Sequence, residues 1–336
     1  MTNFLGLGIS VSNEGPVEET VALAQKAEEL GFDEVSIPES RLFRSVTTTA
    51  AAVLSRTDRI TVRIGIANPV TRHPLLLALE AATLADLGPG RIRFGLGAAE
   101  WTVKELGIDP AGWRPYTNTV ESLRAMRSLL AGRSLGFTPT TFISSSEATL
   151  DCPVPRNIPI DIGAVNTRML EAAGAHADGV QLGAITSVGY THWAAEQIKQ
   201  SATNAGRDHA EILISANVLT SVDPDRQVAR NAVREVLAYY LSRVEGVVIE
   251  ESGADTDDID QVRQAFTRGG LAAGASAVSE HLIDTFSVAG TPNEVVKGLA
   301  PYADAGLQMP LVWHTFGPNS MDALSTIAKE IRPGLW

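Results

Sequence analysis

Eight short apolar segments, each followed by a stretch with helical periodicity, constrain this chain more than any other feature. They lie at residues 4–10, 33–38, 60–67, 92–97, 158–163, 178–183, 212–219 and 309–314. Segments that are apolar throughout are typical of parallel strands covered on both faces. Eight strand–helix units in succession therefore predict the α/β class and, within it, a (β/α)8 TIM barrel.

The intervening stretches carry helix start and stop signals. The first has Pro16 and two acidic residues at its start and Gly31 at its end, as the helix dipole and the conformational preferences of proline and glycine favour. Further helices are predicted at 46–55, 74–87, 117–131, 165–175, 188–204, 224–240, 292–305 and 320–331.

The whole chain, residues 1–336, is expected to form a single domain. A doubly wound pair of Rossmann-like halves is the alternative, but no Gly/Ser-rich or Pro-rich linker divides the chain near its middle. The stretch 241–289 interrupts the alternation and is acidic at 251–260, so we expect a helical insertion there.

Composition excludes several function classes. A net charge of −12 argues against binding to nucleic acid, whose phosphates repel an acidic surface. The longest apolar runs fall far short of the ~18–20 residues that a membrane span needs. Cys152 is the single cysteine, which excludes an internal disulfide. We therefore expect a soluble, cytoplasmic protein without a membrane or nucleic-acid partner.

In a TIM barrel the functional site lies at the carboxyl ends of the strands. Candidate residues at these ends are Glu39, Ser40, Asn68, Glu100, Trp101, Val165, Asn166, Thr167, Arg168, Gly183 and His314. The six histidines have no metal-ligand spacing, so no metal site is predicted. Ser40 lacks the surroundings of a nucleophile elbow, and His73 is expected to be structural.

The segment IRFGLGAAEW (92–101) begins like a dinucleotide fingerprint but has Glu100 where the third glycine would stand. Small residues before it allow a ligand to approach the backbone closely. A carboxylate beside Trp101 could serve as a general acid. Equally, Glu100 could be an acidic residue in the first turn of a helix.

Two further candidates also have two interpretations. Glu39 either accepts a hydrogen bond from a ring N–H group or pairs with Arg41 or Arg44. The strand–turn–helix at 160–175 either binds an anion through backbone N–H groups, Thr167 and Arg168, or simply has Asn166 as its N-cap.

The segments AEELGFDEVSIPES (27–40), GIANPVTRHPLLLALEAATLADLGPGRIRFGLGAAE (65–100), MLEAAGAHADGVQLG (169–183) and AGTPNEVVKGLAPYADAGLQMPLVW (289–313) occur in this order. Together they resemble the luciferase-like flavin and deazaflavin oxidoreductases. The resemblance covers nearly the whole chain and is strongest to the branch that uses coenzyme F420, a 5-deazaflavin, which includes the methylenetetrahydromethanopterin reductases.

This resemblance implies a cofactor site. A non-proline cis peptide between Gly65 and Ile66 would press on the deazaflavin ring, and Asn68 and Glu39 would touch it. Ser40 stands where some members have a histidine. The complete set of cofactor-binding residues predicted in this way is Glu39, Gly65, Ile66, Asn68, Ala98, Ala99, Gly163, Ala164, Val165, Asn166, Thr167, Arg168 and Gly183.

The implied reaction is hydride transfer between F420 and an unidentified small organic molecule. Glu100 would be the acid/base, with Ser40 and His314 as secondary polar groups. Trp101 and Trp113, in the loop that follows, either contact substrate in an apolar pocket or pack within the loop. A monooxygenase that uses reduced FMN and O2 is the first alternative, and a non-catalytic ligand-binding barrel is the second. The resemblance also implies a homodimer.

Overall fold

A computed structural model of the protein describes residues 2–39, 42–98, 100–109, 113–154, 157–183, 185–244, 246–317 and 319–336. For Glu100, Trp101, Thr102, His314 and Thr315 it describes the backbone alone.

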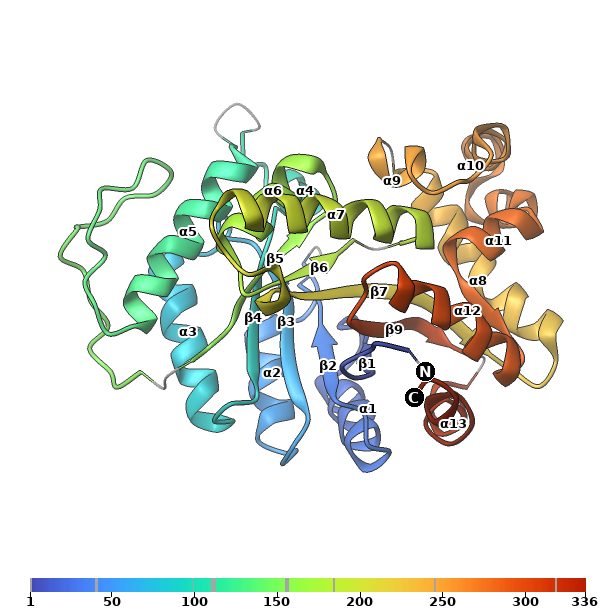
Figure 1. Cartoon of the computed structure of the whole chain (residues 1–336), viewed down its shortest axis with the longest axis horizontal. Coiled ribbons are helices and arrows are strands. Elements are labelled where there is room, and N and C mark those ends of the chain that lie inside the picture. Colours follow the sequence, from blue (N-terminus) through green and yellow to red (C-terminus); the bar gives the residue numbers. More distant parts are fainter. Residues whose placement is uncertain are drawn as a thin grey trace.

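Eight parallel strands close a barrel, which confirms the predicted fold class (Figure 1). They are β1 (Gly8–Ser10), β2 (Glu34–Ile37), β3 (Thr61–Ala67), β4 (Ile92–Leu96), β5 (Ile160–Ala164), β6 (Gly179–Leu182), β7 (Leu213–Val222) and β9 (Met309–Phe316). Each of the strands β1 to β6 pairs with the next strand along the chain. Strand β9 lies between β7 and β1 and closes the barrel.

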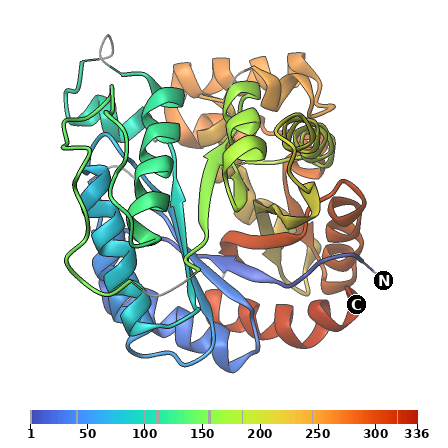
Figure 2. The ribbon, with the colours of Figure 1, turned by 60° about the vertical axis from the view of Figure 1, so that its left-hand side comes forward.

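Helices surround these strands, as Figure 2 shows from a second side. They are α1 (Val17–Glu29), α2 (Val46–Leu54), α3 (Pro74–Leu87), α4 (Glu100–Glu105), α5 (Pro115–Leu130), α6 (Thr167–His176), α7 (Val188–Asn204), α8 (Arg226–Leu241), α9 (Val247–Glu250), α10 (Thr256–Ala277), α11 (Glu280–Phe286), α12 (Pro292–Asp304) and α13 (Ser320–Thr326). Both views place the two chain ends side by side, and the Thr2 backbone N–H donates to the Leu335 carbonyl at 3.0 Å.

The bounds of α3 and α7 agree with the sequence expectation because strong local signals fix them. Pro74 opens α3, and the Ser187 hydroxyl caps α7 by accepting from the Tyr190 N–H. Two short elements were not among the predicted strands and helices. Strand β8 (Val288–Gly290) has three residues and pairs with the far end of β7, and α4 is a six-residue helix that only one interpretation of Glu100 allowed. Both are too short to show a periodic pattern.

Helices α9–α11 occupy the region of the expected insertion. They pack on α8 around a second hydrophobic core that includes Leu237, Ile259, Leu282, Phe286 and Trp313. Trp313 belongs to β9 and also faces the barrel mouth, so the insertion is coupled by packing to that end of the barrel. Among the helices that the structure describes, none is both long and apolar enough to cross a membrane.

A group of charged side chains fills the inside of the barrel. Arg63 on β3 is fully buried; its Nε donates to Glu34 of β2 at 2.5 Å, and its Nη1 donates to Asp161 of β5. Arg93 of β4 donates to the same Asp161 through Nε at 2.9 Å and Nη2 at 2.6 Å. Burial disfavours the charge on Arg63, but the two carboxylates outweigh this and raise the pKa of its guanidinium. These contacts connect four neighbouring strands.

Replacing Arg63 tests this arrangement. We expect Arg63→Met to lower the free energy of unfolding by about 3–5 kcal/mol, because it leaves the buried Glu34 carboxylate without its cation and leaves Asp161 paired with Arg93 alone. Urea denaturation followed by circular dichroism measures the loss. Arg56→Met is the matched control: Arg56 pairs with Glu18 on the surface, and we expect its loss to cost under about 1 kcal/mol. Equal losses in the two variants would contradict the structural role of Arg63.

Candidate active site

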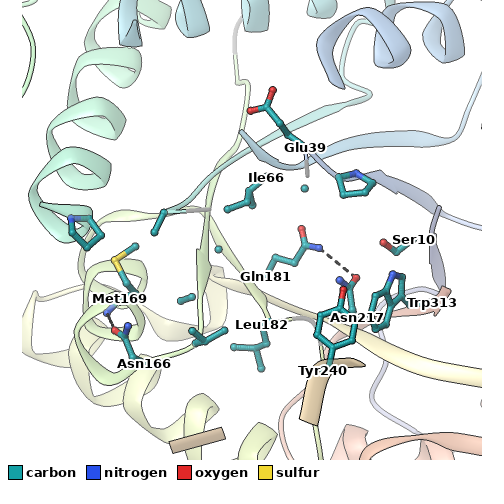
Figure 3. A pocket seen from close by; sticks show the side chains of 18 of the residues that line it. Ser10, Glu39, Ile66, Asn166, Met169, Gln181, Leu182, Asn217, Tyr240 and Trp313 are labelled. Carbon is teal, nitrogen blue, oxygen red and sulfur yellow. Dashed lines mark hydrogen bonds between the residues drawn. The ribbon is translucent and has the colours of Figure 1, made fainter. Parts of the chain in front are cut away.

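A cavity of about 1160 Å³ opens at the carboxyl ends of the barrel strands. Residues of β1, β3, β5, β6, β7 and β9 line it, together with the segment after β2 and the turn before α6 (Figure 3). This is the end of the barrel at which TIM-barrel enzymes place their active sites. The size suits a cofactor and a small substrate together.

One wall of the cavity is an irregular peptide segment of β3. The peptide bond between Gly65 and Ile66 is cis, as the resemblance implied. The register between β3 and β4 shifts at the same place: Ile64 lies opposite Phe94, whereas Ala67 lies opposite Leu96. The bulge therefore turns the Gly65–Ile66 unit toward the cavity.

Glycines on the neighbouring strands make room for the bulge. A Cβ atom on Gly97 would overlap with Cδ1 of Ile66, and one on Gly163 would lie 3.0 Å from the same atom. A Cβ on Gly65 would collide with the Ser36 hydroxyl and lie 2.6 Å from Oε1 of Gln181. In IRFGLG, Gly97 thus provides space for Ile66.

Gln181 of β6 lines the cavity, and one of its side-chain atoms is a buried, unused hydrogen-bond acceptor. Its side chain is 6% exposed. Its Nε2 lies 3.4 Å from Oδ1 of Asn217 (Figure 3). The Ser36 hydroxyl lies 3.5 Å from the same Nε2, and the two contacts orient the amide. Its Oε1 has no hydrogen-bond partner among the described residues. A buried acceptor without a partner is costly, so a donor that reached this atom would gain a hydrogen bond.

Sequence reasoning missed Gln181. The available signal was a polar residue in the middle of the apolar segment DGVQLG. Ser10, Asn217, Tyr240 and Trp313 also line the cavity without having been predicted to do so.

Glu39 lines the cavity and is held by the segment after β3. Its Oε2 accepts from the Asn68 backbone N–H at 3.1 Å, and its Oε1 lies 2.7 Å from Nη2 of Arg72. Arg41 lies outside the described residues, and the ion pair that the structure shows is with Arg72 rather than Arg44. Arg72 also approaches Glu80 at 3.7 Å. Burial raises the pKa of Glu80; Arg72 opposes this rise and the Glu39 charge adds to it.

Asn68 is fully buried and is not among the residues that line the cavity. Its Oδ1 accepts from the backbone N–H groups of Val70 and Thr71 at 2.7 and 3.2 Å, and its Nδ2 donates to the Ala98 carbonyl. The side chain therefore ties the segment after β3 to the end of β4. Its contact with a cofactor stays a prediction.

The segment from Gly163 to Arg168 borders the cavity along its whole length. It comprises the end of β5, the turn before α6 and the start of α6. Asn166 is the N-cap of α6: its Oδ1 accepts from the Met169 N–H at 3.1 Å. The two interpretations of this turn are compatible. The cap satisfies the Met169 N–H, whereas the backbone N–H groups of Thr167 and Arg168, which line the cavity, have no partner within the helix. Such groups carry partial positive charge and bind anions. The guanidinium of Arg168 lies 5.0 Å from the centre of the Tyr116 ring.

Aromatic side chains border the remaining part of the cavity. Tyr240 of α8 and Trp313 of β9 make a T-shaped contact with their ring centres 5.4 Å apart. Trp113 lines the cavity, and its buried indole Nε1 has no hydrogen-bond partner among the described residues. Trp113 therefore borders the cavity, and its contact with a substrate stays a prediction.

Several predicted residues fall outside what the structure describes. Ser40 and Ala99 are not described, and neither are the side chains of Glu100, Trp101 and His314. The backbone of Glu100 begins α4, as one of its two interpretations required; its role in proton transfer stays a prediction. His73 caps α3 by accepting from the Leu75 N–H at 3.3 Å, a structural role as expected. The described residues contain no cluster of metal-ligating side chains.

Comparison with known proteins identifies the family. The model of the luciferase-like monooxygenase family matches residues 4–309. The chain belongs to this family.

Relatives within the family cover the whole chain. A 5,10-methylenetetrahydromethanopterin reductase of Methanolobus tindarius is 31% identical, over 96% of this chain and 98% of the relative. An F420-dependent glucose-6-phosphate dehydrogenase of Rhodococcus erythropolis is 27% identical, over 100% and 99%. The solved structure of the coenzyme F420-dependent tetrahydromethanopterin reductase from Methanopyrus kandleri superimposes with a TM-score of 0.92 and 26% identity, covering 99% and 100%.

The fit of Ile66 against Gly97 makes a testable pair. We expect Gly97→Ala to cost about 1–3 kcal/mol of unfolding free energy, because the new methyl overlaps with Cδ1 of Ile66 in a packed site. Ile66→Val removes that atom, so the double variant is expected to regain at least about 0.5 kcal/mol over the sum of the single losses. Urea denaturation of the four proteins measures the coupling. Gly15→Ala, which meets only the flexible Glu19 carboxylate, is the control; additive losses would contradict the contact.

Proposed function

We propose that this chain is an oxidoreductase that transfers a hydride between coenzyme F420 and a small organic substrate in the barrel cavity. The printed names of the relatives support F420 as the cofactor. The observation that carries the proposal is the cavity wall in which the cis Gly65–Ile66 unit stands beside the unpartnered Oε1 of Gln181.

The residues present fit a flat ring with an anionic side chain. Gly65 and Ile66 offer a surface against which a ring can stack, and Gln181 offers an acceptor for a ring N–H group. The turn from Val165 to Arg168 offers helix-start N–H groups and a guanidinium to the anionic part. Ala98, Ala99, Gly163, Ala164 and Gly183 complete the proposed set with Glu39 and Asn68. When bound, the deazaflavin supplies the carbon that accepts or donates the hydride.

The protein's own contribution is orientation, exclusion of water and proton transfer. Ser36 and Asn217 fix the amide of Gln181. Trp313 and Tyr240, together with Trp113 and Trp101, would shield the substrate from water. Glu100 is the proposed acid/base, with Ser40 and His314 as secondary polar groups.

We further propose that the protein acts as a homodimer in the cytoplasm. Helix α3 is apolar on nearly all sides, and its outer face exposes Leu76 by 55% and Leu79 by 41%. Ile143 is 96% exposed. Its backbone carbonyl lies 3.0 Å from Nε2 of His73, at the start of α3. A second copy of the chain would cover these side chains. A lone cysteine, Cys152, is compatible with a reducing compartment.

Fluorescence titration with F420 and with FMN tests the cofactor assignment. We expect F420 to bind more tightly than FMN. Gln181→Leu should weaken F420 binding about tenfold or more, because a ring N–H group loses its buried acceptor. Gln200→Leu, on the exposed face of α7, is the matched control and should bind like the wild type. Tighter binding of FMN would favour the monooxygenase alternative, and binding of neither cofactor would favour a non-catalytic barrel.

Replacement of Glu100 tests the proposed proton transfer. With any substrate that supports turnover of the wild type, we expect Glu100→Gln to lower kcat by roughly 10²–10⁴ while the Kd for F420 is unchanged. The absorbance of F420 reports both turnover and binding. Glu105→Gln, in the same helix α4, is the control. A Glu100→Gln variant with nearly full turnover would exclude Glu100 as the acid/base.

A further inference from the structure

A second cavity, of about 700 Å³, lies at the far end of helices α5 and α6 from the active-site cavity. The first turns of both helices line the active-site cavity: Thr117 of α5 and Arg168 of α6 are examples. The last turns line the second one, with Arg127 on α5 and His176 on α6. The two cavities therefore share two helices but no lining residue.

Four arginines surround this second cavity: Arg124, Arg127, Arg133 and Arg207. The chain as a whole has a net charge of −12, so this concentration of positive charge runs against its composition. Asp178 pairs with Arg127 at 2.8 Å, and the charge of Glu211 acts on Arg207. Two carboxylates thus offset four guanidinium groups, and positive charge is left in excess.

Contacts within the protein hold the guanidinium groups of Arg124, Arg127 and Arg207 in place without using all their donors. Arg207 donates to the carbonyls of Gly174 and Ala177 at 2.8 and 2.7 Å. Arg124 stacks on the Phe137 ring with its central carbon 4.1 Å from the ring centre, which leaves the N–H edge of the group available. Nη2 of Arg127 is buried and lies 2.8 Å from Oδ1 of Asp178, and this ion pair holds the group.

The loop that carries Arg133 is also fixed. The Arg133 backbone N–H donates to the Ser128 carbonyl at 3.1 Å, and the Ser128 hydroxyl donates to the Ser134 carbonyl at 2.6 Å. Preorganised guanidinium groups bind phosphate oxygens in pairs of hydrogen bonds. Because their positions are set before a ligand arrives, little side-chain entropy is lost on binding.

We propose that this second cavity is a binding site for a small phosphorylated molecule or other oxyanion with at least two negative charges. The site is separate from the one that the proposed function uses. His176 reports its occupancy: burial lowers the pKa of this imidazole, and the charges of Arg207 and Arg127 lower it further. A bound anion offsets those charges and raises the pKa of His176.

Calorimetric titration with inorganic pyrophosphate, without F420 and at an ionic strength held constant with KCl, tests the site. We expect saturable binding to the wild type and an affinity at least about tenfold lower for the Arg124→Gln/Arg133→Gln variant, since each lost charged hydrogen bond contributes to affinity. The control variant, Arg268→Gln/Lys329→Gln, loses the same charge at exposed positions away from both cavities and should bind like the wild type.

A second readout separates this site from the turn before α6. Pyrophosphate should raise the pKa of His176, followed by NMR of the imidazole ring. Equal affinity in the wild type and the Arg124→Gln/Arg133→Gln variant would overturn the proposal, as would saturable binding that leaves the pKa of His176 unchanged. Because F420 is absent, neither outcome depends on the cofactor assignment.

Discussion

The buried ion pairs of Arg63 with Glu34 and Asp161 fix the inside of the barrel, and the candidate active site is built directly on them. Side chains two residues apart on a strand point to the same face. Two residues beyond Glu34, Arg63 and Asp161, toward the carboxyl end, stand Ser36, Gly65 and Gly163. The charged layer therefore determines which residues of β2, β3 and β5 face the cavity and at what height.

In this second layer, small side chains and one amide replace the branched apolar residues that usually fill a barrel. Gly65 and Gly163 leave space, and the Ser36 hydroxyl orients Gln181 from the opposite side of the barrel. The space is occupied in part by Ile66, which the bulge in β3 turns inward. The result is a cavity with a rigid wall and a buried acceptor, Oε1 of Gln181, which suits recognition of a planar ring with an N–H group.

Local signals explain how much could be predicted from the sequence. Pro74 and Ser187 each mark the start of a helix, and the apolar segments predict the strands of the barrel, so the fold could be predicted from short-range sequence patterns. Contacts between residues distant in the sequence could not be predicted from such patterns. Glu39 pairs with Arg72 and Gln181 approaches Ser36 only because the closed barrel brings their strands together. The cis peptide at Gly65–Ile66 was expected from family resemblance and not from any local propensity.

A crystal structure of the protein with F420 bound would show how the cavity holds the cofactor. We expect the deazaflavin ring against Gly65 and Ile66, with a ring N–H within hydrogen-bond distance of Oε1 of Gln181. We also expect the anionic side chain at the turn from Val165 to Arg168. A ring bound elsewhere, or one that leaves Oε1 of Gln181 without a partner, would contradict this binding mode.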